Sequence, residues 1–246
     1  MQNIKVKILN PEVLKTTRSL ACLAARITQH GESIRDFDDI DRLSSISDSL
    51  VSTLISLPHK NLLKHTMISV IVIGASSRFL AQITRHQDGI NFTSASCQYS
   101  DYSNDADFVV PMSVKENHYR SIYAQNCKRM LEEYKELVDK VGRDDASYLL
   151  PKALRNVLLI SATPAEWQHV ISQRICKRNT PEMRYVVLKI AALLNDVAPD
   201  IFNATTCGPF CQSTVFCKEG KFSCGNPYNV TTDFKSILRN EFNEDI

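Results

Sequence analysis

The feature that most constrains the fold is an apolar run that passes through a glycine into an amphipathic segment. The run Met67–Ile73 is rich in valine and isoleucine and ends at Gly74, a pattern typical of a buried strand. The next segment, from Ala75 to His86, has apolar residues at helical spacing and predicts a helix. A strand, a turn and a helix in this order can hold several side chains rigidly over a ligand.

One face of the predicted helix can pack inward, and the other face is polar. The polar positions recur at i, i+4, i+7 and i+8, so they lie on the same side of the helix. These residues are Arg78, Gln82, Arg85 and His86. Two guanidinium groups, an amide and an imidazole suit an anion that carries an amide-like ring. The same spacing also occurs on solvated helix faces with ordinary surface arginines, and periodicity alone leaves both interpretations open.

This segment and the loop after it resemble the signature of the flavin-dependent thymidylate synthases. That signature runs Ser-Arg, a spacer, Gln, two residues and Arg-His-Arg, and its loop ends in Ser-x-Arg-Tyr. The matching residues, with a small gap allowed before the asparagine, are Ser77, Arg78, Gln82, Arg85, His86, Asn91, Ser96 and Tyr99. Gln87 and Gln98 stand where the family has arginine, and Thr93 stands where it has an acidic residue or glutamine.

Three further segments extend the resemblance. The stretch Glu166–Arg174 reads Glu-Trp-Gln-His-Val-Ile-Ser-Gln-Arg and is similar to the family's Glu-Trp-x-His-Phe-x-x-Leu-Arg. His59 and His65 keep the spacing of the family's Gly-His-x-Ser-x-x-Glu-His turn, although the residues alone favour a surface or structural histidine pair. Ser147 replaces a family arginine that reaches a nucleotide phosphate, and residues 163–165 read Thr-Pro-Ala where the family has Asn-x-Arg.

The resemblance implies an α+β fold with a central, mostly antiparallel sheet, long flanking helices and assembly into a homotetramer. It also implies a methyltransferase or related one-carbon transferase acting on C5 of a pyrimidine deoxynucleotide, either methylating dUMP to dTMP or adding a group such as hydroxymethyl. The implied cofactors are FAD, NADPH and methylenetetrahydrofolate. By the same resemblance Arg174 is catalytic, and the nucleotide is bound by Gln82, Arg85, Ser96, Gln98 and Arg174. The flavin is bound by His59, Arg78, His86, Asn91 and His169.

Four positions of the family pattern, 87, 98, 147 and 165, have lost arginine in this chain. Each charge-assisted contact contributes roughly 1.5–3 kcal/mol, so the usual ligands lose affinity unless other groups compensate. Two alternatives therefore stay open beside the enzyme. One is a divergent paralogue that acts on another nucleotide without the usual flavin contacts, and the other is a catalytically silent tetrameric scaffold.

The charge and hydropathy of the chain limit the classes of partner that it is expected to bind. A formal net charge of +2 over 246 residues argues against a strongly electrostatic nucleic-acid binder, so we expect a small-molecule nucleotide and no nucleic acid polymer. The first ten residues carry no signal-peptide pattern, and no apolar run approaches the roughly 18 residues of a membrane helix. We expect a cytoplasmic protein without a membrane partner, in the host cytoplasm if the chain is phage-encoded.

Apolar periodicity and helix-start signals predict the remaining elements. Strands are expected within Met1–Asn10 and over Asn156–Ala162. The expected helices are Pro11–Ile27, Phe37–Leu57, Val114–Val141, a helix opening at Thr163, and Pro181–Val197.

Half of the eight cysteines lie in an irregular, glycine-containing stretch near the C-terminus. They are Cys207, Cys211, Cys217 and Cys224. Four thiolates this close suit tetrahedral zinc, which would stabilise a tail without its own core. Reduced free cysteines or a local disulfide remain open alternatives. The sequence thus predicts an α+β domain over residues 1–203 and a cysteine-containing tail over 204–246.

Overall fold

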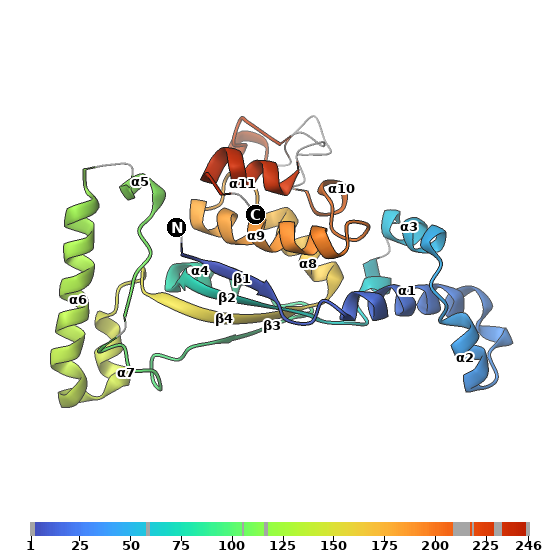
Figure 1. Ribbon diagram of the computed structural model, residues 1–246, viewed down its shortest axis with the longest axis horizontal. Helices are drawn as coiled ribbons and strands as arrows, with labels where there is room; N and C mark the ends of the chain where they lie inside the picture. Colours follow the sequence, from blue (N-terminus) through green and yellow to red (C-terminus); the bar gives the residue numbers. More distant parts are fainter. Residues whose placement is uncertain are drawn as a thin grey trace.

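The computed structural model describes residues 3–57, 60–104, 106–115, 118–208, 217, 219–228 and 233–244. Within them the centre is a four-stranded antiparallel sheet with strand order β1-β2-β4-β3 (Figure 1). The strands are β1 Lys5–Ile8, β2 Ile68–Ser76, β3 Ile90–Ser94 and β4 Arg155–Ala162. The predicted α+β class with an antiparallel sheet is confirmed.

The sheet is covered by helices on one face. In β2, Ile68, Val70 and Val72 alternate onto that face and are completely buried, as the period of a half-buried strand requires. Four helices lie over this face (Figure 1): α4 Ser77–Ile83, α8 Pro164–Arg174, α9 Pro181–Val197 and α11 Phe234–Phe242. The opposite face carries Ile73 and Val157, which are register partners and are 43% and 42% exposed.

Helices α8 and α9 begin at the predicted positions. The hydroxyls of Thr163 and Thr180 accept hydrogen bonds from backbone N–H groups of the first turn, and a proline follows each threonine. Helix α11 was not predicted, because it is short and lies in the stretch that the cysteine pattern dominated. It packs on α9 and brings Phe234, Ile237 and Leu238 into the common core. The division of the chain at residue 203 stays a prediction.

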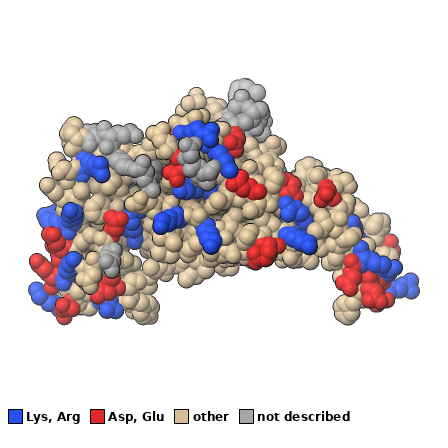
Figure 2. Space-filling view, viewed as in Figure 1, with Lys and Arg blue, Asp and Glu red and all other residues tan. Residues whose placement is uncertain are grey.

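The other helices extend from the two ends of the sheet (Figure 1). One end carries α1 Val13–His30, α2 Phe37–Leu43 and α3 Asp48–Ser56, and the other carries α5 Met112–Lys115, α6 Arg120–Val141 and α7 Arg143–Ala146. The shorter elements are α10 Ala204–Cys207 and the 3-10 turns Gly31–Ser33, Lys60–Leu63, Ser147–Leu149 and Gly220–Phe222. None of the described helices combines the length and apolarity needed to cross a membrane. Acidic and basic side chains lie interspersed at both ends of the face in Figure 2.

Two of the predicted helices are interrupted. The segment Phe37–Leu57 contains two helices rather than one, because the side chains of Asp36 and Ser47 each cap a separate start. The long helix expected over Val114–Val141 is described as α5 and α6, and α6 begins only at Arg120. Apolar spacing continued across both breaks, so periodicity alone did not show them.

The helix predicted from Ala75 to His86 is also shorter than expected. Its first two positions belong to β2, and the hydroxyl of Ser76 caps α4. Helix α4 ends at Ile83, so Arg85 and His86 lie in the loop that leads to β3 and not on a helix face. The prediction of one continuous polar helix stripe was therefore wrong.

Gly89 shapes the end of this loop, and its replacement is a first test of the fold. Its φ of +65° is a left-handed conformation, and a Cβ there would lie 3.2 Å from Oγ1 of Thr163, the cap of α8. We expect Gly89→Ala to lower the free energy of unfolding by about 1–2 kcal/mol, the cost of forcing an L-residue into that region. Urea denaturation followed by circular dichroism measures this difference.

A matched glycine provides the control for this prediction. Gly31 has φ −57° and open space around the position of a Cβ, so Gly31→Ala should leave stability unchanged or raise it slightly. Equal stabilities for the two variants would contradict the strain assigned to the loop.

Candidate functional site

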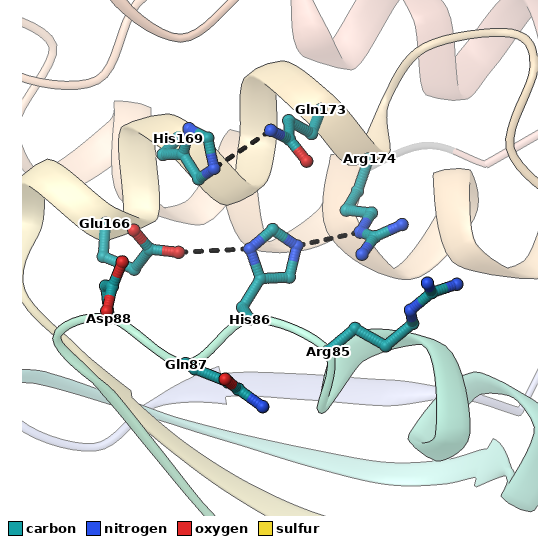
Figure 3. A pocket seen from close by; sticks show the side chains of 8 residues that line it. All are labelled: Arg85, His86, Gln87, Asp88, Glu166, His169, Gln173 and Arg174. Atoms are coloured by element: carbon teal, nitrogen blue, oxygen red, sulfur yellow. Dashed lines mark hydrogen bonds and ion pairs between the residues drawn. The ribbon is translucent and has the colours of Figure 1, made fainter.

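A polar pocket of about 510 Å³ lies between α8 and the loop from α4 to β3 (Figure 3). The loop contributes Arg85, His86, Gln87 and Asp88. The helix contributes Glu166, His169, Gln173 and Arg174. All eight side chains are polar or charged, so the pocket suits a hydrophilic ligand.

Helix α8 presents these four residues because they recur at i, i+3, i+7 and i+8 and share one side. Its opposite side carries Trp167, Val170 and Ile171, which are completely buried. The apolar side fixes the rotation of the helix on the sheet, and this rotation turns the polar side toward the loop.

His86 joins the two walls of the pocket. Its Nε2 accepts a hydrogen bond from Nε of Arg174 at 2.9 Å, and its Nδ1 lies 3.1 Å from Oε1 of Glu166 (Figure 3). An arginine side chain can only donate, so Nε2 is the acceptor and carries no proton. The proton of the neutral imidazole is therefore on Nδ1, which donates to Glu166.

The pKa values of this pair are both displaced. Burial, together with Arg174 and His169, lowers the pKa of His86 to about 4. Burial and the neighbouring Asp88 raise the pKa of Glu166 to about 7, with Lys64 acting in the opposite direction. At neutral pH the imidazole is uncharged, so the contact with Glu166 is a hydrogen bond and not an ion pair.

Arg174 is held at two points. Besides its bond to His86, its Nη2 donates to the backbone carbonyl of Gln82 at 3.2 Å. Burial and the neighbouring Arg85 lower the pKa of Arg174, which shows that the two cations influence each other across the pocket. Two guanidinium groups from separate elements thus converge on one cavity, as the sequence predicted for Arg85 and Arg174, and the pair suits a carboxylate or phosphate.

Three potential metal ligands also meet here. One ligand atom each of His86, Glu166 and His169 lie within 4.8 Å of one another. A histidine ligates a metal through an unprotonated nitrogen, whereas the nitrogen of His86 that faces Glu166 carries the proton. Together with the two nearby arginines, this tautomer favours an anion over a cation.

Other predicted ligand residues lie outside this pocket. Gln82 is half-buried, and its Oε1 accepts from the hydroxyl of Thr180 at 3.2 Å. Arg78 is exposed in the first turn of α4. Asn91 is exposed on β3, on the side of the sheet opposite to the buried Ile90. His59 lies outside the described residues.

Ser96 and Gln98 belong to the loop that follows β3. After β3 the chain runs toward the end of the molecule where α7 lies (Figure 1). The backbone carbonyl of Tyr99 in this loop accepts a hydrogen bond from Arg143 of α7 at 3.4 Å. Neither Ser96 nor Gln98 lines the pocket at α8. Within the part of the chain that the structure describes, the predicted nucleotide ligands are therefore divided between two places.

The described cysteines of the tail do not form a metal site. Cys207 is completely buried, its thiol lies 3.9 Å from the carbonyl of Ile201, and burial raises its pKa to about 12. Cys217 and Cys224 are half-buried, and these two and Cys207 are not among the potential ligand clusters of the described residues. Cys211 lies outside the described residues, so the predicted zinc site has no support from this geometry.

Sequence reasoning assigned no role in the site to four of the pocket residues, namely Gln87, Asp88, Glu166 and Gln173. Glu166 appeared in the motif match without a role. The spacing of positions 166, 169, 173 and 174 on one helix face was available in the sequence, but nothing in it indicated that the loop at His86 would pack there.

This chain is similar to known proteins over most of its length. A family model described as thymidylate synthase complementing protein matches residues 12–200. A flavin-dependent thymidylate synthase of Geobacter sulfurreducens is 28% identical over 220 residues, covering 87% of this chain and 92% of the relative. The corresponding protein of Pyrococcus furiosus is 27% identical over 207 residues, covering 80% and 82%.

Two solved structures share the fold. The UMP/dUMP methylase PolB from Streptomyces cacaoi, bound with 5-Br dUMP, has a TM-score of 0.59 at 18% identity and covers 81% of this chain and 93% of its own. Thymidylate synthase X from Helicobacter pylori with FAD and dUMP has a TM-score of 0.59 at 16% identity, covering 81% and 97%.

Proposed function

Because this chain belongs to the thymidylate synthase complementing protein family, the flavin-dependent thymidylate synthases, we propose that it transfers a one-carbon group to C5 of a pyrimidine deoxynucleotide. Methylation of dUMP to dTMP is the first candidate, and hydroxymethylation is a variant of the same reaction. The observation that carries the proposal is the convergence of Arg85 and Arg174 on one pocket. Paired guanidiniums can hold a phosphate or polarise the carbonyls of a uracil ring.

In this proposal the protein provides placement and electrostatics. Arg174 acts on the pyrimidine with its guanidinium held between His86 and the carbonyl of Gln82. Arg85 faces the same cavity and neutralises negative charge on the ligand. The described residues that line the pocket include no thiol, hydroxyl or amine nucleophile, which suits a reaction whose difficult step is carried by a cofactor.

The donor set of the pocket fits an anionic flavin cofactor, because the nitrogen groups of two arginines, two histidines and two glutamines outnumber its two carboxylates. His86 and His169 are the described residues of the pocket that we assign to FAD, with Arg78, Asn91 and His59 as further proposed contacts. FAD supplies hydride when it is bound and reduced by NADPH, and methylenetetrahydrofolate supplies the carbon.

We further propose that the active assembly is a homotetramer. Ser96 and Gln98 lie away from Arg174 in this chain, so a second copy is needed to bring all predicted nucleotide ligands together. The uncovered face of the sheet, with exposed Ile73 and Val157, offers an apolar surface for such a contact. A monomeric mass in light scattering would argue against this assembly.

Purified protein provides the first test of the function. We expect it to show the yellow absorbance of bound flavin and to release labelled hydrogen from C5 of dUMP when reduced flavin and methylenetetrahydrofolate are present. Parallel assays with UMP and dCMP identify the base. Nucleotide turnover with another base would favour the divergent paralogue, and colourless protein that binds neither FAD nor any of these nucleotides would favour the silent scaffold.

A second candidate function, a divergent paralogue that acts on another nucleotide, is favoured by the loss of arginine at four positions of the family pattern. Positions 87 and 98 are glutamine, 147 is serine and 165 is alanine.

Zinc in the cysteine tail also remains a proposal, and metal analysis of the purified protein tests it: metal-free, fully stable protein would exclude a structural zinc.

A further inference from the structure

We propose that Glu166 is a positioning residue that orients Arg174 for ligand binding through His86. The inference rests on the proposed function, since it concerns the arginine assigned to the nucleotide. It gives a role to a residue for which the motif match implies none.

Glu166, His86 and Arg174 form a hydrogen-bonded bridge, in which His86 links two residues of α8 that do not contact each other. Glu166 and Arg174 lie in the first and last turns of α8, about 12 Å apart along the helix axis, which is too far for direct contact. His86 comes from the loop before β3 and contacts both, at 3.1 Å and 2.9 Å. The side chains of His86 and Glu166 are 4% and 12% exposed, so their contact is shielded from water.

The bridge decides which way the guanidinium of Arg174 faces. Its Nε is used by His86, and one N–H of Nη2 is used by the carbonyl of Gln82. The remaining N–H groups are left for the pocket, on the side where Arg85 lies. A planar guanidinium held at two points presents its donors in one fixed plane, which reduces the entropy lost when a ligand binds.

Glu166 acts on this geometry by setting the tautomer of His86. A carboxylate accepts the Nδ1 proton and leaves Nε2 free to accept from Arg174. Without an acceptor at position 166, no hydrogen bond from Nδ1 to that side chain stabilises the tautomer of His86 that is protonated at Nδ1. With the proton on Nε2, two N–H groups would face each other and the hold on Arg174 would be lost.

The charged and titratable groups around Glu166 come from the loop before β3, from Lys64 and from α8 itself. Asp88 in the loop raises the pKa of its carboxyl, Lys64 acts in the opposite direction, and the neutral His86 donates to it. His169 lies on the same helix, and the cations Arg85 and Arg174 lie across the pocket. Ionised Glu166 therefore strengthens the bond to His86 but also adds negative charge near an anion site, and these two effects on ligand affinity have opposite signs. We infer that the first effect is the larger, because the carboxylate contacts His86 directly at 3.1 Å.

A purely structural role is the competing explanation. An acidic residue in the first turn of a helix stabilises it through the helix dipole, whatever else it contacts. Glu12, an exposed glutamate at the N-cap of α1 whose side chain makes no cap bond, also places a carboxylate near a helix N-terminus but has no such bridge, and it is the control.

The first experiment measures dUMP affinity by calorimetry. We expect Glu166→Ala to bind dUMP about tenfold more weakly, the effect of about 1.4 kcal/mol from one misplaced charge-assisted contact. Glu166→Gln should recover most of the affinity, because its amide oxygen can still accept from Nδ1. Glu12→Ala should bind as the unchanged protein does. Unchanged affinity in Glu166→Ala would overturn the proposal.

The second experiment compares the unchanged protein with Glu166→Gln between about pH 6 and about pH 8, one unit on either side of the carboxyl's pKa of about 7. Both proteins meet the same nucleotide, so titration of its phosphate cancels in the ratio of affinities. If the carboxylate positions Arg174, the ratio of the dUMP affinity of the unchanged protein to that of Glu166→Gln should rise as pH rises and Glu166 ionises. A ratio that falls, or stays constant, would overturn the proposal.

A readout without nucleotide separates this inference from the proposed function. Nitrogen NMR of histidine-labelled protein should show His86 protonated at Nδ1, and Glu166→Ala should shift that signal while Glu12→Ala leaves it unchanged. If no pyrimidine nucleotide binds but this shift is seen, the proposed function fails and the coupling of Glu166 to His86 stands. If dUMP binds and the signal does not move, the positioning role fails alone.

Discussion

Replacing Arg174 with alanine is expected to abolish measurable dUMP binding. The guanidinium is the best-oriented cation of the pocket, and each charge-assisted hydrogen bond that it makes to a ligand contributes roughly 1.5–3 kcal/mol. Loss of two such bonds weakens binding by at least about 100-fold. Isothermal titration of dUMP into the variant measures the loss.

Two further variants sharpen this test. Arg174→Lys keeps the charge but not the planar fork that bonds to His86 and Gln82 together, so we expect it to recover only a small part of the affinity. Arg42→Ala removes a guanidinium that is 75% exposed on α2 and pairs with Asp39, and it should bind dUMP normally. Unchanged affinity in Arg174→Ala would reject the site as assigned.

The second large effect is expected in the core beneath the pocket. Trp167 is completely buried, and its Nε1 donates to the carbonyl of Ile68 in β2 at 3.0 Å. Trp167→Ala should lower the free energy of unfolding by about 3–5 kcal/mol, because it opens a large cavity and leaves a buried carbonyl without its donor. Since the chain has one tryptophan, unfolding of this variant is followed by circular dichroism rather than by tryptophan fluorescence.

Trp167→Phe provides the comparison. It keeps most of the apolar volume and loses the hydrogen bond, so we expect a smaller loss, about 1–3 kcal/mol for the unsatisfied carbonyl and the residual void. If Trp167→Ala and the unchanged protein unfolded at the same urea concentration, the packing of α8 on β2 described here would be wrong.

The elements that the sequence predicted well are those in which local signals agree. Thr163 followed by Pro164 predicts the start of α8, and Pro181 predicts the start of α9. The valine and isoleucine run around Val70 predicts β2. Where the apolar spacing runs past a local stop, it misleads. Ser47 interrupts the helix predicted over residues 37–57, because a side-chain cap can begin a new helix without any change of periodicity.

The predicted site was partly right for the wrong reason. Arg85 was expected on a helix stripe with Arg78, but α4 ends at Ile83 and the two arginines separate. Arg85 nevertheless lines the same pocket as Arg174, because the loop between α4 and β3 packs against α8. The direction of a loop depends on what it packs against, and spacing along one element does not contain that information.

Local patterns of residue type and spacing in the sequence were enough to identify the family, the strands β1, β2 and β4, and the candidate cations Arg85 and Arg174. Strand β3 was not predicted, because Ile90–Ser94 lies within a polar run that is typical of a loop. Only the tertiary structure decided that His86 lies between Glu166 and Arg174, which proton its ring carries, and why the carboxyl opposite it has a raised pKa. Tautomers and pKa values depend on burial and on partners 80 or more positions away in the chain, so they exist only once the fold has brought those groups together.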